Sequence, residues 1–187
     1  MTTEERKQAI LVRLPADGKR PFIIALDGRA ASGKTTLASS LAKRTGAEVV
    51  SADDFFLPPS LRTPERRAEP GGNIHYERFK EEVVGGLHGG KPFSYGVFDC
   101  SVMEVGSQKN VDPSGIVIVE GSYSLHPFFG DYADLTVFCD VSPGEQYQRI
   151  LKRNGEEKAR TFRDLWIPLE EKYFSAFGIR EKADLIL

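Results

Sequence analysis

Short, largely apolar segments recur along the chain between longer polar stretches. Such short runs, rich in Val and Ile, are typical of strands that are buried on both faces of a sheet. Four of them predict strands, and a closing apolar stretch predicts a fifth: Phe22–Leu26, Glu48–Ser51, Ile116–Val119, Leu135–Cys139 and Ala183–Leu187.

The segments between these strands carry apolar residues at helical spacing. This pattern predicts four helices, at Thr3–Leu14, Lys34–Lys43, Tyr76–Leu87 and Pro143–Lys152. Turn residues at Ala16–Gly18 separate the first helix from the first strand. Strands that alternate with helices indicate a parallel sheet covered by helices on both faces. The sequence therefore predicts a single α/β domain over residues 1–187, with a sheet of about five strands.

Two stretches interrupt this alternation. Phe55–Asn73 is rich in Pro, Gly and Arg and is longer than an ordinary connection, which favours a functional loop. Phe93–Val105 predicts a small β-hairpin or flap before the third core strand, with its turn expected near Tyr95 and Gly96.

Composition narrows the class of protein. A chain of 187 residues, 40% of them apolar, can build a core without a disulfide or a metal to support it. The two cysteines, Cys100 and Cys139, lack the spacing of a metal cluster, and we expect both to be reduced and buried as small hydrophobic residues. No apolar, signal-like segment opens the sequence, so a cytoplasmic location is expected.

Charge and hydropathy bear on the partners. A net charge of -2 offers no overall positive field for a nucleic-acid backbone. The longest apolar runs fall far below the roughly 18 residues that cross a bilayer. We therefore expect a small-molecule partner, with no nucleic acid and no membrane, and the sequence is compatible with a homo-oligomer.

The strongest motif runs from Gly28 to Thr35 and matches G-x-x-x-x-G-K-[ST] in full, directly after a strand and before a helix. Gly28 and Gly33 let the backbone curl so that its N–H groups point at phosphate oxygens. Lys34 then reaches the β- and γ-phosphates, and Thr35 offers its hydroxyl to Mg²⁺. The predicted ATP-binding residues are Gly28, Ala30, Ala31, Ser32, Gly33, Lys34, Thr35 and Thr36.

A phosphate loop alone fits a switch GTPase, a motor ATPase or a kinase. A switch GTPase would carry Asp-x-x-Gly at the end of its metal-binding strand and Asn-Lys-x-Asp for guanine. Asp112–Gly115 has the first spelling but precedes its strand, and Asn-Lys-x-Asp is absent from the sequence. The other acidic residues must therefore decide between the classes.

Acidic residues follow two of the strands, at the edge of the sheet where the phosphate loop is expected. Asp53 and Asp54 follow the second strand, and Glu120 follows the third. A kinase needs a carboxylate that orients the attacking hydroxyl and accepts its proton. We assign that role to Asp53, and expect Asp54 to tether the loop. Glu120 resembles a Walker B acid and is predicted to hold the magnesium shell or touch the substrate; the alternative is that these acids only cap loops.

Together these motifs resemble the uridine kinase and nicotinamide riboside kinase branch of the P-loop kinases. The resemblance rests on Asp27–Thr35, Ser51–Phe56 and Val119–Gly121, and a weaker match runs to about Tyr173. It implies the P-loop NTPase fold, with Asp53 as base and metal partner and Glu120 supporting the metal or the acceptor. It also implies that Tyr76 and Glu77 grip a nucleoside acceptor, although packing in the core explains Tyr76 equally well.

Basic residues gather after the fourth strand. Arg149 and Arg153 share one helix face, and Arg160 and Arg163 follow. The segment resembles the family's helical lid, whose arginines fold over the phosphates and exclude water. The resemblance implies a lid at about residues 153–164 with Arg153 and Arg160 as catalytic arginines, and the alternative is a solvated helix surface.

The sequence thus predicts an ATP- and Mg²⁺-dependent kinase that transfers the γ-phosphate to a hydroxyl of a small molecule, with Lys34 and Asp53 at the reaction centre. The expected acceptor is the 5′-hydroxyl of a uridine- or cytidine-like ribonucleoside. Two alternatives stay open. One is a kinase for another metabolite, such as nicotinamide riboside, pantothenate or a sugar-like alcohol, and the other is a regulatory module that binds nucleotide without catalysis.

Overall fold

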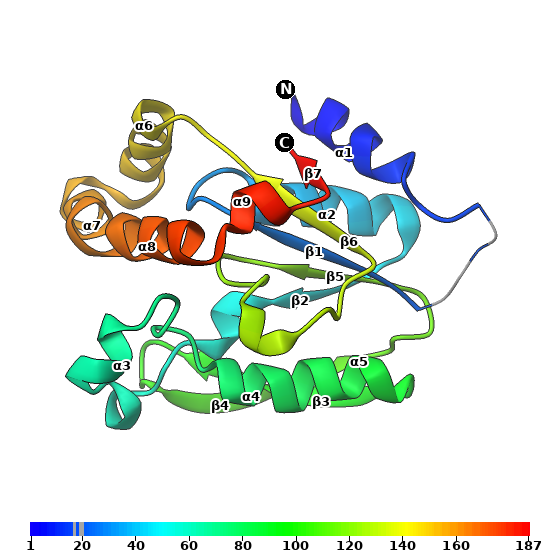
Figure 1. Cartoon of the computed structure of the whole chain (residues 1–187), viewed down its shortest axis with the longest axis horizontal. Helices are drawn as coiled ribbons and strands as arrows, with labels where there is room; N and C mark the ends of the chain where they lie inside the picture. Colours follow the sequence, from blue (N-terminus) through cyan, green and yellow to red (C-terminus); the bar gives the residue numbers. More distant parts are fainter. Residues whose placement is uncertain (17, 19–20) are drawn as a thin grey trace.

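A computed structural model describes residues 1–16, 18 and 21–187, so Asp17 of the predicted turn lies outside the described residues. Among these residues, five parallel strands form the main sheet in the order β2-β5-β1-β6-β7 (Figure 1). They are β1 (Phe22–Gly28), β2 (Glu48–Ser51), β5 (Ile116–Glu120), β6 (Leu135–Cys139) and β7 (Leu185–Ile186). The five predicted strands are confirmed, and the last is shorter than expected.

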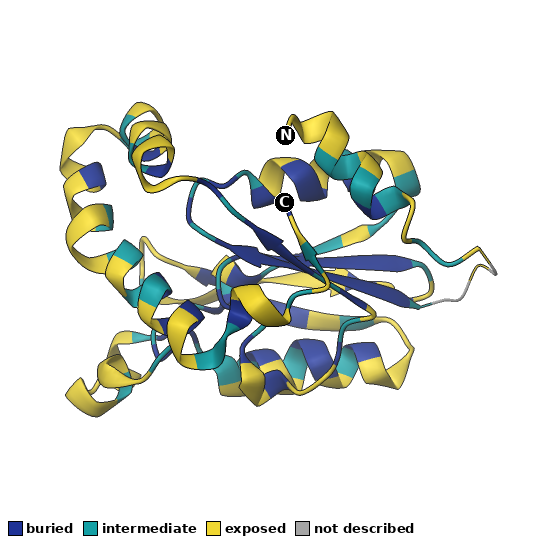
Figure 2. Cartoon of the chain, turned by 45° about the horizontal axis from the view of Figure 1, so that its top comes forward, coloured by how far each residue is buried: buried dark blue, intermediate teal, exposed yellow. Residues whose placement is uncertain are grey.

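Side chains of the central strands alternate between two cores, one on each face of the sheet. Figure 2 shows that the central strands are buried along most of their length. On one face, Ile24 of β1 belongs to the same core as Leu37 of helix α2 (Lys34–Thr45) and Ile10 of helix α1 (Thr3–Leu11). On the other face, Ile23 belongs with Phe79 and with aromatic residues of the C-terminal helices. Burial on both faces explains why these strands are continuously apolar.

Helix α1 is shorter than predicted and ends at Leu11. It begins with a capping box in which Thr2 and Glu5 satisfy each other's backbone N–H groups. Arg13 and Leu14 then form tighter turns, with N–H bonds to the carbonyls of Ile10 and Leu11 at 2.9 and 3.2 Å. Pro15 explains this early end, because the residue before a proline is driven out of the helical region.

The other predicted helices are confirmed. A helical run composed of α4 (Tyr76–Phe79), a π-helical turn (Lys80–Val84) and α5 (Gly85–Gly89) covers one face of the sheet. The C-terminal part forms α6 (Pro143–Asn154), α7 (Glu156–Thr161), a π-helical turn (Phe162–Trp166), α8 (Ile167–Phe177) and α9 (Ile179–Lys182). Figure 1 shows α6 to α8 beyond one end of the central strands. In the described part of the chain, no helix is long and apolar enough to span a membrane.

The predicted flap is a separate two-stranded hairpin of β3 (Phe93–Asp99) and β4 (Glu104–Val111). The turn expected near Tyr95 and Gly96 is wrong, since both residues lie within β3 and the chain turns over residues 100–103. Tyr95 is 1% exposed and its hydroxyl donates to Asp54 at 2.9 Å, so the core holds this segment in a strand.

The two cysteines occupy different environments. Cys139 is buried in β6, as expected, and burial raises the pKa of its thiol to about 11. The expectation of burial is wrong for Cys100, which is exposed at the turn of the hairpin. A hairpin turn has no second layer to cover it, which explains the difference.

The turn out of β1 is too tight for any residue but glycine. Gly28 has a φ of 131°, and a Cβ there would lie 2.1 Å from the carbonyl oxygen of Cys139 on β6. That oxygen also accepts the N–H of Arg29 at 3.2 Å, so it cannot move away freely. The phosphate loop is therefore fixed at its first residue by the neighbouring strand.

Replacing Gly28 with alanine should destabilise the protein strongly, because both the contact and the φ angle exclude a side chain. We expect a loss of about 2–4 kcal/mol in the free energy of unfolding by denaturant. Gly144→Ala in the first turn of α6 is the control, since a Cβ there meets nothing within 4 Å. Equal stability of the two variants would contradict the close approach of β1 and β6.

Candidate active site

The predicted phosphate loop joins β1 to α2. Its backbone turns through positive φ angles of 58° at Ala31 and 97° at Gly33. The 12-residue helix α2 begins directly at Lys34, so the positive end of its dipole faces the loop. Lys34 is 7% exposed, and its ammonium donates to the carbonyls of Gly28 and Arg29 at 2.7 and 2.9 Å. The chain between β1 and α2 therefore has the tight backbone turn that the motif predicts.

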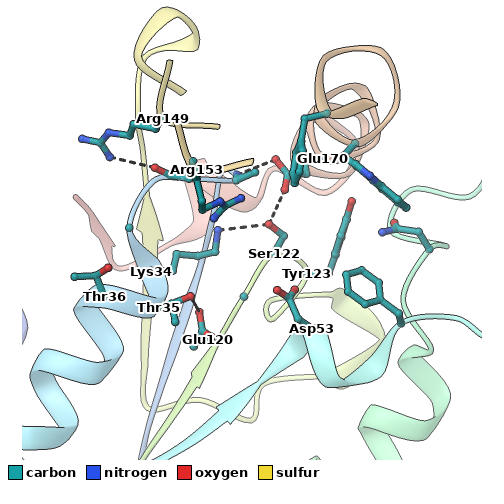
Figure 3. Close-up of a pocket in the computed structure, with 18 residues that line it drawn as sticks. Lys34, Thr35, Thr36, Asp53, Glu120, Ser122, Tyr123, Arg149, Arg153 and Glu170 are labelled. Atoms are coloured by element: carbon teal, nitrogen blue, oxygen red, sulfur yellow. Dashed lines mark hydrogen bonds between the residues drawn. The ribbon is translucent and has the colours of Figure 1, made fainter. Parts of the chain in front are cut away.

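A cavity of about 500 Å³ opens beside this loop (Figure 3). The sheet contributes the residues that follow β2 and β5, and the helices α6 and α8 contribute others. Predicted site residues that line the cavity are Ala30, Ala31, Gly33, Lys34, Thr35, Thr36, Asp53, Glu120 and Arg153. Gly28 and Ser32 are not among the lining residues, and the carbonyl of Ser32 instead accepts a bond from Arg6 of α1 at 2.8 Å.

Thr35 and Glu120 meet at the floor of the cavity. The Thr35 hydroxyl donates to one oxygen of Glu120 at 3.0 Å, and the Ser51 hydroxyl donates to the other at 3.3 Å. Glu120 is 4% exposed, and burial raises the pKa of its carboxyl. The two residues come from the start of α2 and the end of β5, so the parallel strands bring them to one edge as predicted.

These oxygen donors fit a magnesium ion that arrives with a nucleotide. In the part of the chain that the structure describes, no three His, Cys, Asp or Glu side chains lie close enough to hold a metal by themselves. Mg²⁺ in phosphoryl-transfer sites takes one or two carboxylates together with phosphate oxygens. Thr35 and Glu120 supply hard oxygen ligands of this kind beside the phosphate loop, and Asp53 lines the same cavity.

Asp53 and Asp54 point to different places, as expected. Asp53 opens onto the cavity and its side chain is exposed there (Figure 3). Partial desolvation by the surrounding protein atoms raises the pKa of Asp53 and the negative charge of Asp54 adds to the rise, while the positive charges of Lys34 and Arg153 oppose it. Asp54 instead holds the hairpin, because its carboxylate accepts from Tyr95 at 2.9 Å and pairs with Lys109 at 3.4 Å.

The lid arginines divide into two groups. Arg149 and Arg153 line the cavity, and Arg149 also donates to the carbonyl of Ala31 at 3.1 Å. Arg160 does not line it: the side chain is 62% exposed and pairs with Glu156 on the same helix at 2.6 Å. The structure therefore brings Arg153 together with the predicted site and leaves Arg160 at the surface of α7.

Tyr76 and Glu77 also lie outside the cavity lining. Both contact Arg66, whose guanidinium stacks on the Tyr76 ring at 3.6 Å and donates to the two Glu77 oxygens at 2.6 and 2.9 Å. Arg66 also donates to the carbonyls of Gly72 and Ile74 at 3.0 Å each. In this structure the aromatic-acid pair thus anchors the long loop that follows β2.

Several residues of the cavity were not predicted from the sequence. They are aromatic or polar side chains from three separate segments: Phe56, Asn73, Ser122, Tyr123, Phe162, Trp166 and Glu170. Phe56 and Trp166 approach each other, with ring centroids 6.4 Å apart. Ser122 and Tyr123 directly follow Glu120-Gly121, so the strand-end argument that found Glu120 applies to them as well. For Glu170 the sequence offers no comparable signal.

Known proteins resemble this chain along most of its length, although no protein-family model matches it. A uridine kinase of Ureaplasma parvum is 26% identical over 155 residues, which is 77% of this chain and 74% of that protein. Uridine kinase-like protein 5 of Arabidopsis thaliana is 24% identical over 159 residues, which is 81% of this chain but 34% of that longer protein.

Two solved structures have the same fold. A possible uridine kinase from Bacillus stearothermophilus gives a TM-score of 0.69 at 18% identity, covering 99% of this chain and 96% of its own. This chain has the fold of the P-loop kinases and resembles uridine kinases along most of its length. A candidate fructose transport system kinase from Silicibacter shares the P-loop kinase fold with a TM-score of 0.72 at 23% identity, covering 100% and 99% of the two chains.

The long loop that follows β2 depends on Arg66, so Arg66→Ala should loosen it. The variant loses bonds to Glu77 and to two loop carbonyls, and we expect faster amide hydrogen exchange across residues 57–73. The strands β1 and β5 should keep their protection. Arg67→Ala, at the exposed next position, is the control. Unchanged exchange in the Arg66 variant would show that Tyr76 and Glu77 do not anchor the loop.

Proposed function

We propose that this kinase uses ATP and Mg²⁺ to phosphorylate a hydroxyl group of a small molecule, with the 5′-hydroxyl of a uridine- or cytidine-like ribonucleoside as the first candidate. The observation that carries the proposal is one cavity that joins the phosphate loop, the Thr35–Glu120 pair and the open carboxylate of Asp53. The likeness to uridine kinases supports the choice of acceptor, although the Arabidopsis relative is much longer than this chain.

Each group has a separate task in this proposal. Lys34 and the loop N–H groups bind the β- and γ-phosphates. Thr35, Glu120 and Asp53 would hold Mg²⁺, which neutralises charge on the transferring phosphoryl group. Asp53 orients the acceptor hydroxyl and accepts its proton. Arg153 stabilises negative charge from the lid side, and a role for Arg160 requires that the lid move to bring it in.

The body of the acceptor would lie against aromatic side chains on the Asp53 side of the cavity. Phe56 follows Asp53 by one turn, and Trp166 faces it from the lid. Asn73 and Tyr123 add polar groups to the same cavity. Aromatic side chains offer flat apolar surfaces on which a planar ring can stack, so a heterocyclic base suits this part of the cavity.

A sugar-like acceptor is the second candidate, and a specific observation favours it. Tyr76 and Glu77, which the family resemblance assigned to a nucleoside, are occupied by Arg66 and lie outside the cavity lining. The Silicibacter neighbour is described as a candidate fructose transport system kinase. A module that binds nucleotide without catalysis is less favoured, because it has no need for carboxylates at two strand ends. A cytoplasmic location and a homo-oligomer stay predictions.

The deciding experiment measures ADP release by the purified protein with Mg-ATP and a panel of acceptors. The panel contains uridine, cytidine, nicotinamide riboside, pantothenate and simple sugars, with a control lacking acceptor. Stimulation by uridine or cytidine supports the first candidate, and stimulation by a sugar alone supports the second. If the protein binds ATP but no acceptor stimulates ADP release, both candidates are contradicted and the non-catalytic module is favoured.

Asp53→Asn should retain Mg-ATP binding but lose turnover by about 100-fold or more, because the amide cannot accept the hydroxyl proton. Lys34→Ala should lose turnover and also weaken nucleotide binding, because it removes charge at the β- and γ-phosphates. Steady-state kinetics and direct nucleotide titration separate the two effects. A near-native kcat in the Asp53 variant would mean that another carboxylate acts as the base.

The pH dependence of kcat/KM should report the protonation state of the proposed base, Asp53. Asp53 must be deprotonated to accept a proton, and crowding raises its pKa, so its inactive protonated form persists to a higher pH than for an ordinary aspartate. We therefore expect the acid limb of kcat/KM to lie at a higher pH than an ordinary aspartate would give. Circular dichroism over the same range controls for unfolding. An acid limb where an ordinary aspartate titrates, or below it, would contradict the assignment.

A further inference from the structure

A buried carboxylate from the lid side, Glu170, lies against the phosphate loop (Figure 3). It is 5% exposed, and both of its oxygens are engaged. One accepts the N–H of Ala30 at 2.9 Å, and the other accepts the hydroxyl of Ser122 at 2.7 Å. A carboxylate is stable in such a place only when it has partners of this kind, so the two bonds fix its position.

These two bonds join three segments that are far apart in the sequence. Ala30 belongs to the phosphate loop, Ser122 follows β5 just after Glu120, and Glu170 lies in α8. The neighbouring acid, Glu171, forms an ion pair with Arg29, the residue before Ala30. Two successive acids of α8 therefore hold two successive residues of the phosphate loop.

The junction lies at the end of the cradle where the transferred phosphate binds. Ser122 Oγ is 3.5 Å from the Nζ atom of Lys34, so Glu170 is separated from that ammonium by a single hydroxyl (Figure 3). The lysine of a phosphate loop reaches the β- and γ-phosphates. Any shift of Ser122 or Ala30 would therefore alter the surroundings of the terminal phosphate.

The helix that carries Glu170 is also anchored in the core. Tyr173, one turn further along α8, is fully buried and donates its hydroxyl to Asp27 at 2.8 Å. Asp27 is itself the residue that precedes the phosphate loop. Because α8 is tied down at this point, the backbone of Glu170 cannot move away from the phosphate loop without breaking buried contacts.

We propose that Glu170 is a positioning residue for phosphoryl transfer, which holds Ala30 and Ser122 so that Lys34 meets the terminal phosphate. This inference rests on the proposed function, since it assumes that the cradle binds ATP. The competing arrangement is that the carboxylate occupies the place of the terminal phosphate and must be displaced by it. The two arrangements predict opposite effects on ATP binding.

The test compares Glu170→Ala and Glu170→Gln, with Glu157→Gln at an exposed site of α7 as the matched control. Titration of Mg-ATP and of Mg-ADP without any acceptor measures binding, and kcat is measured with the acceptor that the panel identifies. We expect Glu170→Ala to weaken Mg-ATP binding about tenfold more than Mg-ADP binding, and to lower kcat about tenfold or more. Glu170→Gln keeps an oxygen for the Ala30 N–H and an amide for Ser122, so it should stay within about threefold of the native protein.

Ser122→Ala provides a second route should Glu170→Ala fold poorly. This variant should show the same selective loss of Mg-ATP binding. In the double variant with Glu170→Ala, the loss of binding free energy should be smaller than the sum of the losses in the two single variants. Tighter Mg-ATP binding in either Glu170 variant would overturn the proposal in favour of displacement. Equal losses of affinity for Mg-ATP and Mg-ADP would contradict the proposal and show that Glu170 only stabilises the fold. The titrations need no acceptor. If no acceptor stimulates ADP release, the proposed function is contradicted, but the binding test of Glu170 can still be carried out.

Discussion

The buried carboxylate of Asp27 ties together the segments that form the site. Its two oxygens accept the backbone N–H groups of Gly28, Tyr123 and Leu125 at 2.6, 3.1 and 3.0 Å, and the Tyr173 hydroxyl at 2.8 Å. Burial raises the pKa of this group, and the donors oppose that shift. Since a buried carboxylate without partners is costly, the start of the phosphate loop, the segment after β5 and helix α8 must keep their relative positions.

That constraint explains how so many ionisable groups share one cavity. Asp53, Glu120 and Glu170 face Lys34, Arg149 and Arg153 around the same space. Burial raises the pKa of Glu120 and Glu170, which means that the fold holds these charges at a cost. Under the proposed function, Lys34 and the arginines would face the phosphates, and Glu120 and Asp53 would face the magnesium ion.

The sequence predicts those parts of the molecule that depend on neighbours along the chain. The strands and the phosphate loop follow from local patterns, and Asp53 and Glu120 follow from the rule that parallel strands end at one edge. Glu170 escapes this reasoning because its partners lie 140 and 48 residues away, and Glu170-Glu171 looks like a solvated helix face. The position of the hairpin turn escapes for a similar reason, since Tyr95 is held in a strand by contacts with distant residues such as Asp54 and Phe55.

The same division would separate the two halves of the proposed reaction. Under that proposal the nucleotide side is built from one continuous motif and two strand ends, which the fold itself brings together. The acceptor side would be assembled from Phe56, Asn73 and Trp166, which come from a long loop and from the turn between α7 and α8. Changes in those segments leave the sheet and the phosphate loop undisturbed. Fold similarity to solved structures therefore leaves the acceptor open, because the acceptor depends on side chains that the fold does not fix.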